Sequence, residues 1–171
     1  GTDDEPLEIE KTDRGVIVSR WLKGSPPSPY YADLVKFEGN SDRLQHYEMC
    51  LPAIALNKSV YTPEGTGGRG KAPIDMTYIN ISYNFMTPID EDHTRYFWFQ
   101  HRNTDPKDKD ISAKMNDGAL MAFLEDKEIL EDVHIGMKNP ATPNIDLGLD
   151  SGAKQFRVLL RRKIEEEQDN S

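Results

Sequence analysis

The alternation of apolar and polar residues predicts that strands fill the first two thirds of the chain. Extended runs rich in Val, Ile, Tyr, Phe and Thr are typical of strands. The first two runs flank Asp13 and Gly15, which favour a tight turn, so we expect a hairpin at the start. Residues 32–37 fit a short helix or a strand equally well, and the pattern leaves them unassigned. The predicted extended runs are residues 7–11, 16–21, 43–62 with an interruption at Pro52, 74–86 and 93–101.

The spacing of apolar residues becomes helical from about Asp110 and stays so to about Met137. Residues 139–146, NPATPNID, interrupt this pattern, and a second helix is expected over 151–167. Short connections between successive strands imply an antiparallel sheet. Helices gathered at the end of the chain would cover one face of that sheet, so the sequence predicts an α+β fold.

One carboxylate interrupts the apolar face of the first predicted helix. At about 100° per residue, Asp126 falls in the middle of an apolar stripe, whereas Glu128 projects from the opposite side. A buried carboxylate needs a cation, so a salt bridge to an arginine of the final helix, a slight rotation of the helix toward solvent, and a metal or acid–base role all remain open. The stripe consists of Leu120, Phe123, Leu130, Val133 and Met137.

Small and polar side chains share one face of the strand expected after Pro52. Strand alternation places Ala53, Ala55, Asn57 and Ser59 together on that face. If a helix packs over it, the remaining space is a ligand pocket, with Asn57 and Asn84 from the next strand as polar anchors. An edge strand facing water is the competing interpretation.

Composition excludes several function classes. The 171 residues include 30 acidic and 21 basic ones, a net charge of −9, which disfavours a nucleic-acid partner. The basic cluster Arg157, Arg161 and Arg162 precedes three glutamates and is expected to be a solvated helix surface. The single cysteine, Cys50, excludes an internal disulfide and fits a reducing cytoplasm. No apolar run approaches the roughly 20 residues of a membrane-spanning helix, so no membrane association is expected.

The short motifs that would indicate other chemistry are incomplete. Gly65, Gly70 and Lys71 have the spacing of a phosphate-binding loop, but Ala72 stands where a Ser or Thr hydroxyl is required, so a flexible hairpin loop is the better interpretation. Cys50 has no signature of an activated nucleophile. None of the histidines lies four residues from another as a helical metal-binding pair would; they are His46, His93, His101 and His134.

Four stretches, in order, resemble the C-terminal catalytic domain of Rieske non-haem iron oxygenases of the vanillate O-demethylase and dicamba monooxygenase type. The resemblance covers most of the chain and depends on the common order of the stretches. They are LNKSVYTPEGT (56–66), MTPIDEDHTRYFWFQHRN (86–103), FLEDKEILE (123–131) and IDLGLDSGAKQFRVLLRRKIEEE (145–167).

This resemblance implies a helix-grip fold, an antiparallel sheet wrapped over a long C-terminal helix. In the family, the Asp of this helix is one ligand of a mononuclear iron(II) held by two His and one carboxylate, a role that falls here on Asp126. The implied activity is O-demethylation or ring hydroxylation of an aromatic or similar small substrate with O2. A separate reductase supplies electrons through a [2Fe–2S] cluster, and the family forms homotrimers. Asn57 and Asn84 are then candidates for orienting the substrate.

The chain departs from the family in lacking both the two-His segment and the Cys-x-His pairs of the [2Fe–2S] domain. It also begins at Gly1 and not at Met. We therefore expect residues 1–171 to be a single catalytic-type domain, a C-terminal fragment that alone holds no cofactor tightly and is inactive. The alternative is a non-catalytic helix-grip carrier of an apolar small ligand, because a fold does not determine a function.

Overall fold

A computed structural model describes residues 5–66, 72–139 and 145–170. The phosphate-loop-like motif falls largely on residues 67–71 and so lies outside the described residues. The chain divides into two compact units. One comprises the residues up to Thr104 together with those from Gly148 onward, and the other comprises Asp105–Leu147. We describe each unit by itself.

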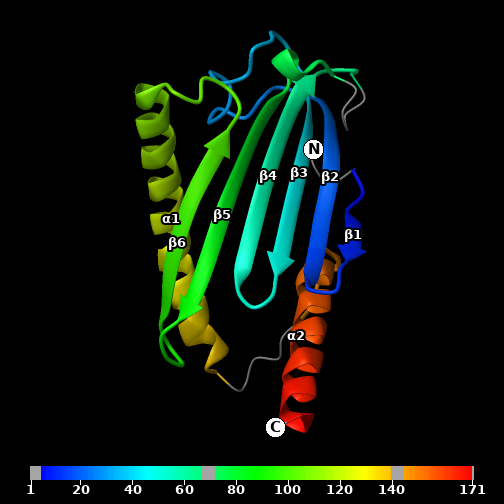
Figure 1. The fold of residues 1–171 in the computed structure, drawn as a ribbon, viewed down its shortest axis with the longest axis vertical. Helices are drawn as coiled ribbons and strands as arrows, with labels where there is room; N and C mark the ends of the chain where they lie inside the picture. The colour runs from blue at the N-terminus through cyan, green and yellow to red at the C-terminus, as the bar shows by residue number, and fades with distance from the viewer. Residues whose placement is uncertain (1–4, 67–71, 140–144, 171) are drawn as a thin grey trace. The chain divides into compact units, whose positions relative to one another are not determined.

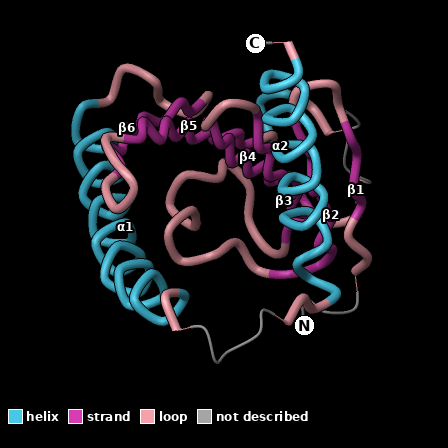
Figure 2. The backbone as a smooth tube through the Cα atoms, turned by 90° about the horizontal axis from the view of Figure 1, so that it is seen from below, coloured by secondary structure: helices cyan, strands magenta, loops and turns pink. Residues whose placement is uncertain are grey.

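The first unit contains a six-stranded antiparallel sheet whose strands follow one another in chain order (Figure 1). Each strand pairs with the next, so the sheet is a simple meander and the predicted α+β class is confirmed. Figure 2 shows the strands side by side from β1 to β6. They are β1 Glu8–Lys11, β2 Gly15–Ser25, β3 Ser41–Cys50, β4 Ile54–Pro63, β5 Tyr78–Pro88 and β6 Thr94–Arg102.

Three local predictions differ from the structure or are settled by it. The strand expected from residue 74 begins only at Tyr78, because Ile74–Met76 forms a 3₁₀ turn after Pro73. The unassigned residues 32–37 are neither helix nor strand but turns and bends. The interruption at Pro52 is the β3–β4 turn, where the Leu51–Pro52 peptide bond is cis.

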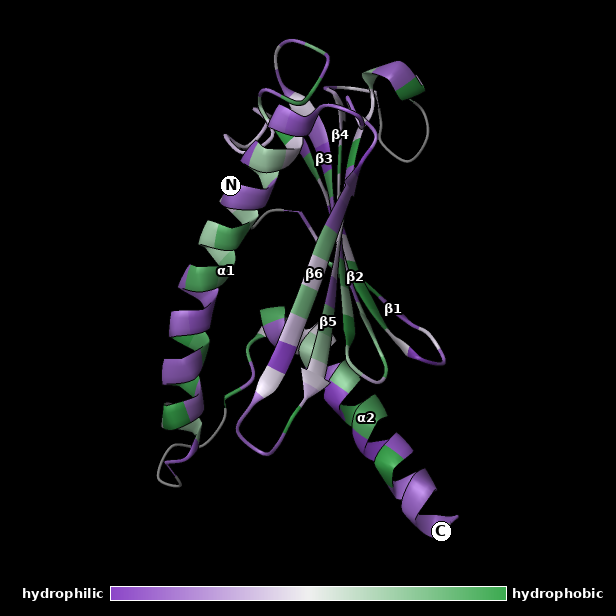
Figure 3. Cartoon of the chain, turned by 60° about the vertical axis from the view of Figure 1, so that its left-hand side comes forward, coloured by the Kyte–Doolittle hydropathy of each residue, from purple (hydrophilic) through white to green (hydrophobic). Residues whose placement is uncertain are grey.

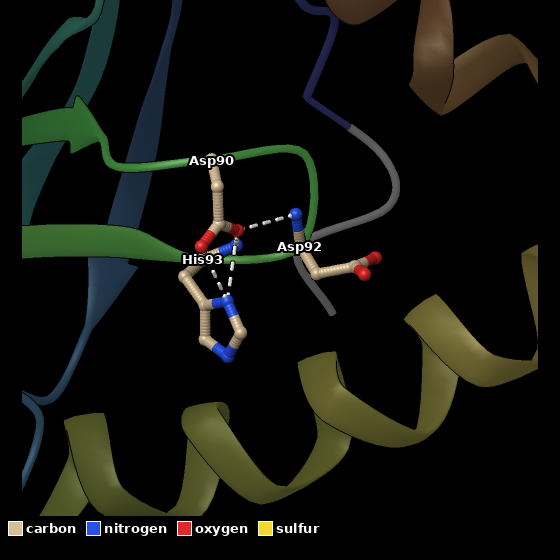
Figure 4. A network of polar contacts seen from close by, with 3 residues as sticks. All are labelled: Asp90, Asp92 and His93. Atoms are coloured by element: carbon tan, nitrogen blue, oxygen red, sulfur yellow. Dashed lines mark hydrogen bonds and ion pairs between the residues drawn. The ribbon is translucent and has the colours of Figure 1, made fainter.

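The β5–β6 hairpin turn is organised by Asp90 (Figure 4). Its carboxylate accepts hydrogen bonds from the backbone N–H groups of Asp92 at 2.9 Å and His93 at 2.8 Å, and it contacts His93 Nδ1 at 2.8 Å. An Asp that binds the backbone two and three residues ahead replaces peptide hydrogen bonds lost at a turn. The contacts lower the pKa of Asp90, chiefly through the Asp92 N–H and then through the His93 side chain.

Helix α2, Ser151–Asp169, belongs to the same unit as the sheet and lies against β2 (Figure 2). Gly152 permits the close approach, because a Cβ there would collide with a Val18 methyl group. Beyond Leu159 the helix becomes polar (Figure 3), and Arg162 lies 3.5 Å from Glu166 one turn later. The predicted solvated helix surface with opposite charges is thus confirmed at this pair.

Helix α1, Lys109–Met137, is the main element of the second unit. It begins at a capping residue, Asp108, whose carboxylate accepts hydrogen bonds from Asp110 N and Ile111 N at 2.9 and 3.0 Å. The helix therefore starts one residue before the predicted position and ends at the predicted Met137. Neither α1 nor α2 is long and apolar enough to cross a membrane, and no other described helix is.

Candidate functional site

The predicted apolar stripe of α1 is largely exposed in the structure. The stripe residues Leu120, Leu130, Val133 and Met137 have 45–69% of their surface exposed. Within this unit the prediction that they face a core is not met, because its described residues form no second helix or strand against which α1 could pack. Burial is confined to the first half of α1, at Met115 and Ala119.

Asp126 nevertheless lies on the same face of α1 as these two buried residues. Ala119 and Met115 precede it by seven and eleven residues, close to two and three full turns of an α-helix. The Asp126 carboxylate is exposed, and it has no hydrogen bond or ion pair with any residue that the structure describes. Its role as a metal ligand remains a prediction.

The described part of the chain brings no three His, Cys, Asp or Glu side chains together in a way that could hold a metal ion. The acid Asp42 is buried, but its two oxygens accept hydrogen bonds from Gly24 N at 3.2 Å and Gly65 N at 3.0 Å. Asp42 therefore ties the end of β2 to the turn that follows β4. Both glycines have positive φ angles, which glycine adopts without strain.

Cys50 does not have the environment of a nucleophile. Burial raises the pKa of its thiol, and the neighbouring Glu48 raises it further through a hydrogen bond of 3.2 Å and its charge. A thiol must lose its proton to act as a nucleophile or a metal ligand. The thiol is therefore protonated at neutral pH, as expected for a cysteine without a catalytic role.

Asn57 and Asn84 lie on the same sheet face, as alternation predicted. In the β4–β5 register Asn57 pairs with Ser82 and Ala55 pairs with Asn84, and directly paired residues project to one side. We call this surface the polar face. It comprises Ala55, Asn57 and Ser59 on β4 and Asn80, Ser82 and Asn84 on β5.

The two asparagines differ in what they offer to a ligand. Asn57 is exposed. Asn84 is buried, accepts a hydrogen bond from the Tyr96 hydroxyl at 2.7 Å and donates one to the Ala55 carbonyl at 3.3 Å. Its amide thus has one protein partner at each end, an arrangement that the sequence pattern did not reveal.

The polar face carries two further side chains that sequence reasoning missed. Asn80 and Ser82 are 2% and 8% exposed, yet Asn80 Oδ1 and Ser82 Oγ find no hydrogen-bond partner among the described residues. Every second residue of β5 projects to this buried face, and these positions hold Tyr78, Asn80, Ser82 and Asn84. This run of polar or amphipathic residues is the sequence signal that could have identified Asn80 and Ser82. Most buried polar groups in proteins are paired, so these exceptions call for an explanation.

An aromatic cluster closes the end of this face. The Tyr31 ring, from the β2–β3 loop, lies 5.2 Å from that of Tyr61 and 5.5 Å from that of Tyr78, and its hydroxyl accepts a hydrogen bond from Asn80 Nδ2 at 3.2 Å. Burial raises the pKa of Tyr78, so its phenol remains protonated in neutral solution. Arg43 stacks over the Tyr61 ring, with its guanidinium carbon 5.2 Å from the ring centre.

A separate cavity of about 470 Å³ lies between the β1–β2 hairpin and α2. Lys11, Lys154 and Arg162 supply positive charge around it, and Val158 and Leu159 supply apolar surface. None of the residues predicted to bind metal or substrate lines this cavity.

The known proteins that this chain resembles agree with one another. The sequence model of the family described as vanillate O-demethylase oxygenase C-terminal domain matches residues 1–166. A putative iron–sulfur subunit of a toluene-4-sulfonate monooxygenase system from Comamonas testosteroni is 31% identical over 166 residues, covering 94% of this chain and 47% of that protein. A vanillate O-demethylase oxygenase subunit from Pseudomonas sp. (strain ATCC 19151) is 26% identical over 171 residues, covering 96% and 52%.

Solved structures agree with the fold. Dicamba monooxygenase bound to 3,6-dichlorosalicylic acid superposes with a TM-score of 0.80 at 17% identity, covering 97% of this chain and 48% of that one. Dicamba monooxygenase with non-haem iron and dicamba gives a TM-score of 0.74 at 16% identity, covering 96% and 50%. The predicted helix-grip class is confirmed by this likeness. The chain spans about half the length of the relatives it matches.

Proposed function

Because the chain belongs to the family of vanillate O-demethylase oxygenase C-terminal domains, we propose that residues 1–171 are the catalytic half of a Rieske-type mononuclear iron oxygenase subunit. The family match over residues 1–166 is the observation that carries this proposal. The parent protein would act on an aromatic or similar small substrate by O-demethylation or hydroxylation with O2. The relatives named for vanillate, toluene-4-sulfonate and dicamba support an aromatic substrate.

The described residues do not by themselves fit a complete iron site. An iron(II) centre of this class needs two His and one carboxylate, whereas no three candidate ligands gather in the described part of the chain. In the proposal, Asp126 is the carboxylate ligand and the two His ligands belong to a segment upstream of residue 1. The iron, when bound, would supply the activation of O2.

The chain's own contribution is then a ligand and a binding surface. Asp126 lies on the face of α1 that is buried at Met115 and Ala119, its own side chain is exposed, and in the proposal this carboxylate binds the metal. Asn57 and Asn84 on the polar face would orient the substrate, with Tyr96 held against Asn84 by a hydrogen bond. A [2Fe–2S] domain, a separate reductase, a homotrimeric assembly and a cytoplasmic location complete the proposal for the parent.

Turnover by the parent protein tests the proposal. The subunit encoded with its upstream segment, supplied with electrons by a reductase, should consume O2 and convert a methoxybenzoate with release of formaldehyde, or hydroxylate it. Residues 1–171 alone should do neither. Tight binding of aromatic compounds by the parent without any O2-dependent product would contradict the proposal and favour the carrier function.

A further inference from the structure

On β5 the polar face contains one buried acceptor and one buried hydroxyl without a described partner, and they are in neighbouring positions. Asn80 and Ser82 are two residues apart, so their side chains leave the same side of the strand about 6.8 Å apart at the backbone. Both side chains can therefore contact the same ligand. Neither Asn80 Oδ1 nor Ser82 Oγ has a partner among the described residues.

The Tyr31 hydroxyl decides which atom Asn80 offers. It accepts the hydrogen bond from Asn80 Nδ2 at 3.2 Å, and this leaves Oδ1 as the end of the amide available to a ligand. An amide oxygen only accepts hydrogen bonds, whereas a serine hydroxyl donates one and accepts others. The complementary ligand group must therefore bring a hydrogen to Asn80, and it can either accept a hydrogen bond from Ser82 or donate one to it.

A hydroxyl group has this complement, and an ionised carboxylate or sulfonate does not. A carboxylate has no hydrogen and would place its charge against the lone pairs of Asn80 Oδ1. The chemistry at this position therefore favours a neutral hydroxyl.

A ligand would approach the pair from the β4 side. Ser82 pairs directly with Asn57, which is exposed, and the β4 neighbours of Asn57 on this face are the small residues Ala55 and Ser59. A ring that reaches Ser82 would lie beside these small side chains. We propose that Asn80 and Ser82 form a subsite that binds a hydroxyl substituent of the aromatic substrate. This inference rests on the proposed function for the identity of the ligand as an aromatic compound.

Calorimetric titration of residues 1–171 tests the subsite with two probes that differ by one hydroxyl, 4-hydroxy-3-methoxybenzoate and 3-methoxybenzoate. The native chain should bind the hydroxylated probe about five- to tenfold more tightly, the value of one net hydrogen bond. The Ser82→Ala variant should lose most of this preference while its affinity for 3-methoxybenzoate stays unchanged.

The Ser19→Ala variant is the matched control. Ser19 is also 8% exposed and lies on a central strand, but it projects from the opposite sheet face, so the preference should persist. Circular dichroism establishes that both variants are folded. A native chain that binds neither probe, binds both equally, or keeps its preference in Ser82→Ala overturns the subsite. O2-dependent turnover by the parent reports on the proposed function separately, so the two failures are distinguishable.

Discussion

The Tyr31 hydroxyl accepts a hydrogen bond from Asn80 Nδ2 at 3.2 Å, and this contact joins the β2–β3 loop to the polar face of the sheet. Asn80 is 2% exposed, so its amide orientation is set by protein partners and not by water. The loop therefore fixes which atom of Asn80 is presented to a ligand.

Replacing Tyr31 by Phe should lower the free energy of unfolding by about 1 kcal/mol, because the buried Asn80 Nδ2 loses its acceptor. Urea denaturation measures the change. Tyr30→Phe is the control, since its hydroxyl makes a longer contact of 3.5 Å to Gln100 at an exposed position. Equal effects of the two substitutions would contradict a stabilising role of the Tyr31–Asn80 hydrogen bond.

Gly152→Ala should destabilise the first unit. The added methyl collides with Val18, whose branched side chain has few alternative rotamers. Overpacking costs about 1–3 kcal/mol, and the better helix propensity of Ala offsets up to about 1 kcal/mol of it. We expect a net loss of roughly 1–2 kcal/mol in urea denaturation.

Gly136→Ala in α1 is the matched change without a collision, because nothing lies within 4 Å of its added methyl. It should raise the helix content or stability slightly. A Gly152→Ala protein as stable as Gly136→Ala would show that α2 does not approach β2 as closely as described.

The Asp90 carboxyl should titrate below its ordinary pKa, which carboxyl chemical shifts measured across acid pH will show. His93→Ala should raise the Asp90 pKa only part of the way, since the Asp92 backbone N–H is the larger cause. Because the folded-state pKa is depressed, the stabilisation is present above the unfolded pKa of Asp and is lost as the pH falls through the folded value. Full restoration of the ordinary pKa in His93→Ala would contradict the hydrogen-bonded turn.

The chain of residues 1–171 should not hold iron tightly. One carboxylate is too few ligands for a mononuclear iron(II) site, and the described residues offer no group of three. Anaerobic titration with ferrous iron should give no stoichiometric binding at micromolar metal. Stoichiometric binding would mean that this chain contains a complete site.

Sequence patterns predicted the strand order, the two helices and the shared face of Asn57 and Asn84, because strand alternation and helical periodicity are local properties. Burial depends on distant partners, which such local patterns do not identify. The apolar stripe of α1 was expected to face a core, but Leu130 and Met137 are 64% and 69% exposed.

The pattern of a single strand did not predict hydrogen-bond partners either. Asn84 was singled out by its position, yet its amide binds Tyr96 and Ala55, and the unpartnered buried atoms of the polar face belong to Asn80 and Ser82. Which of several polar residues on one face stays available depends on the neighbouring strand and on the Tyr31 loop. Neither can be read from alternation along β5 alone.

The iron content of the parent oxygenase with Asp126→Asn tests the central claim most directly. Glu128→Gln is the control, since it removes the same charge from the opposite side of α1, two residues away. We predict that Asp126→Asn loses the mononuclear iron and O2-dependent turnover while keeping its [2Fe–2S] cluster, and that Glu128→Gln keeps all three. Full iron occupancy in Asp126→Asn would contradict the assignment of Asp126 as the ligand.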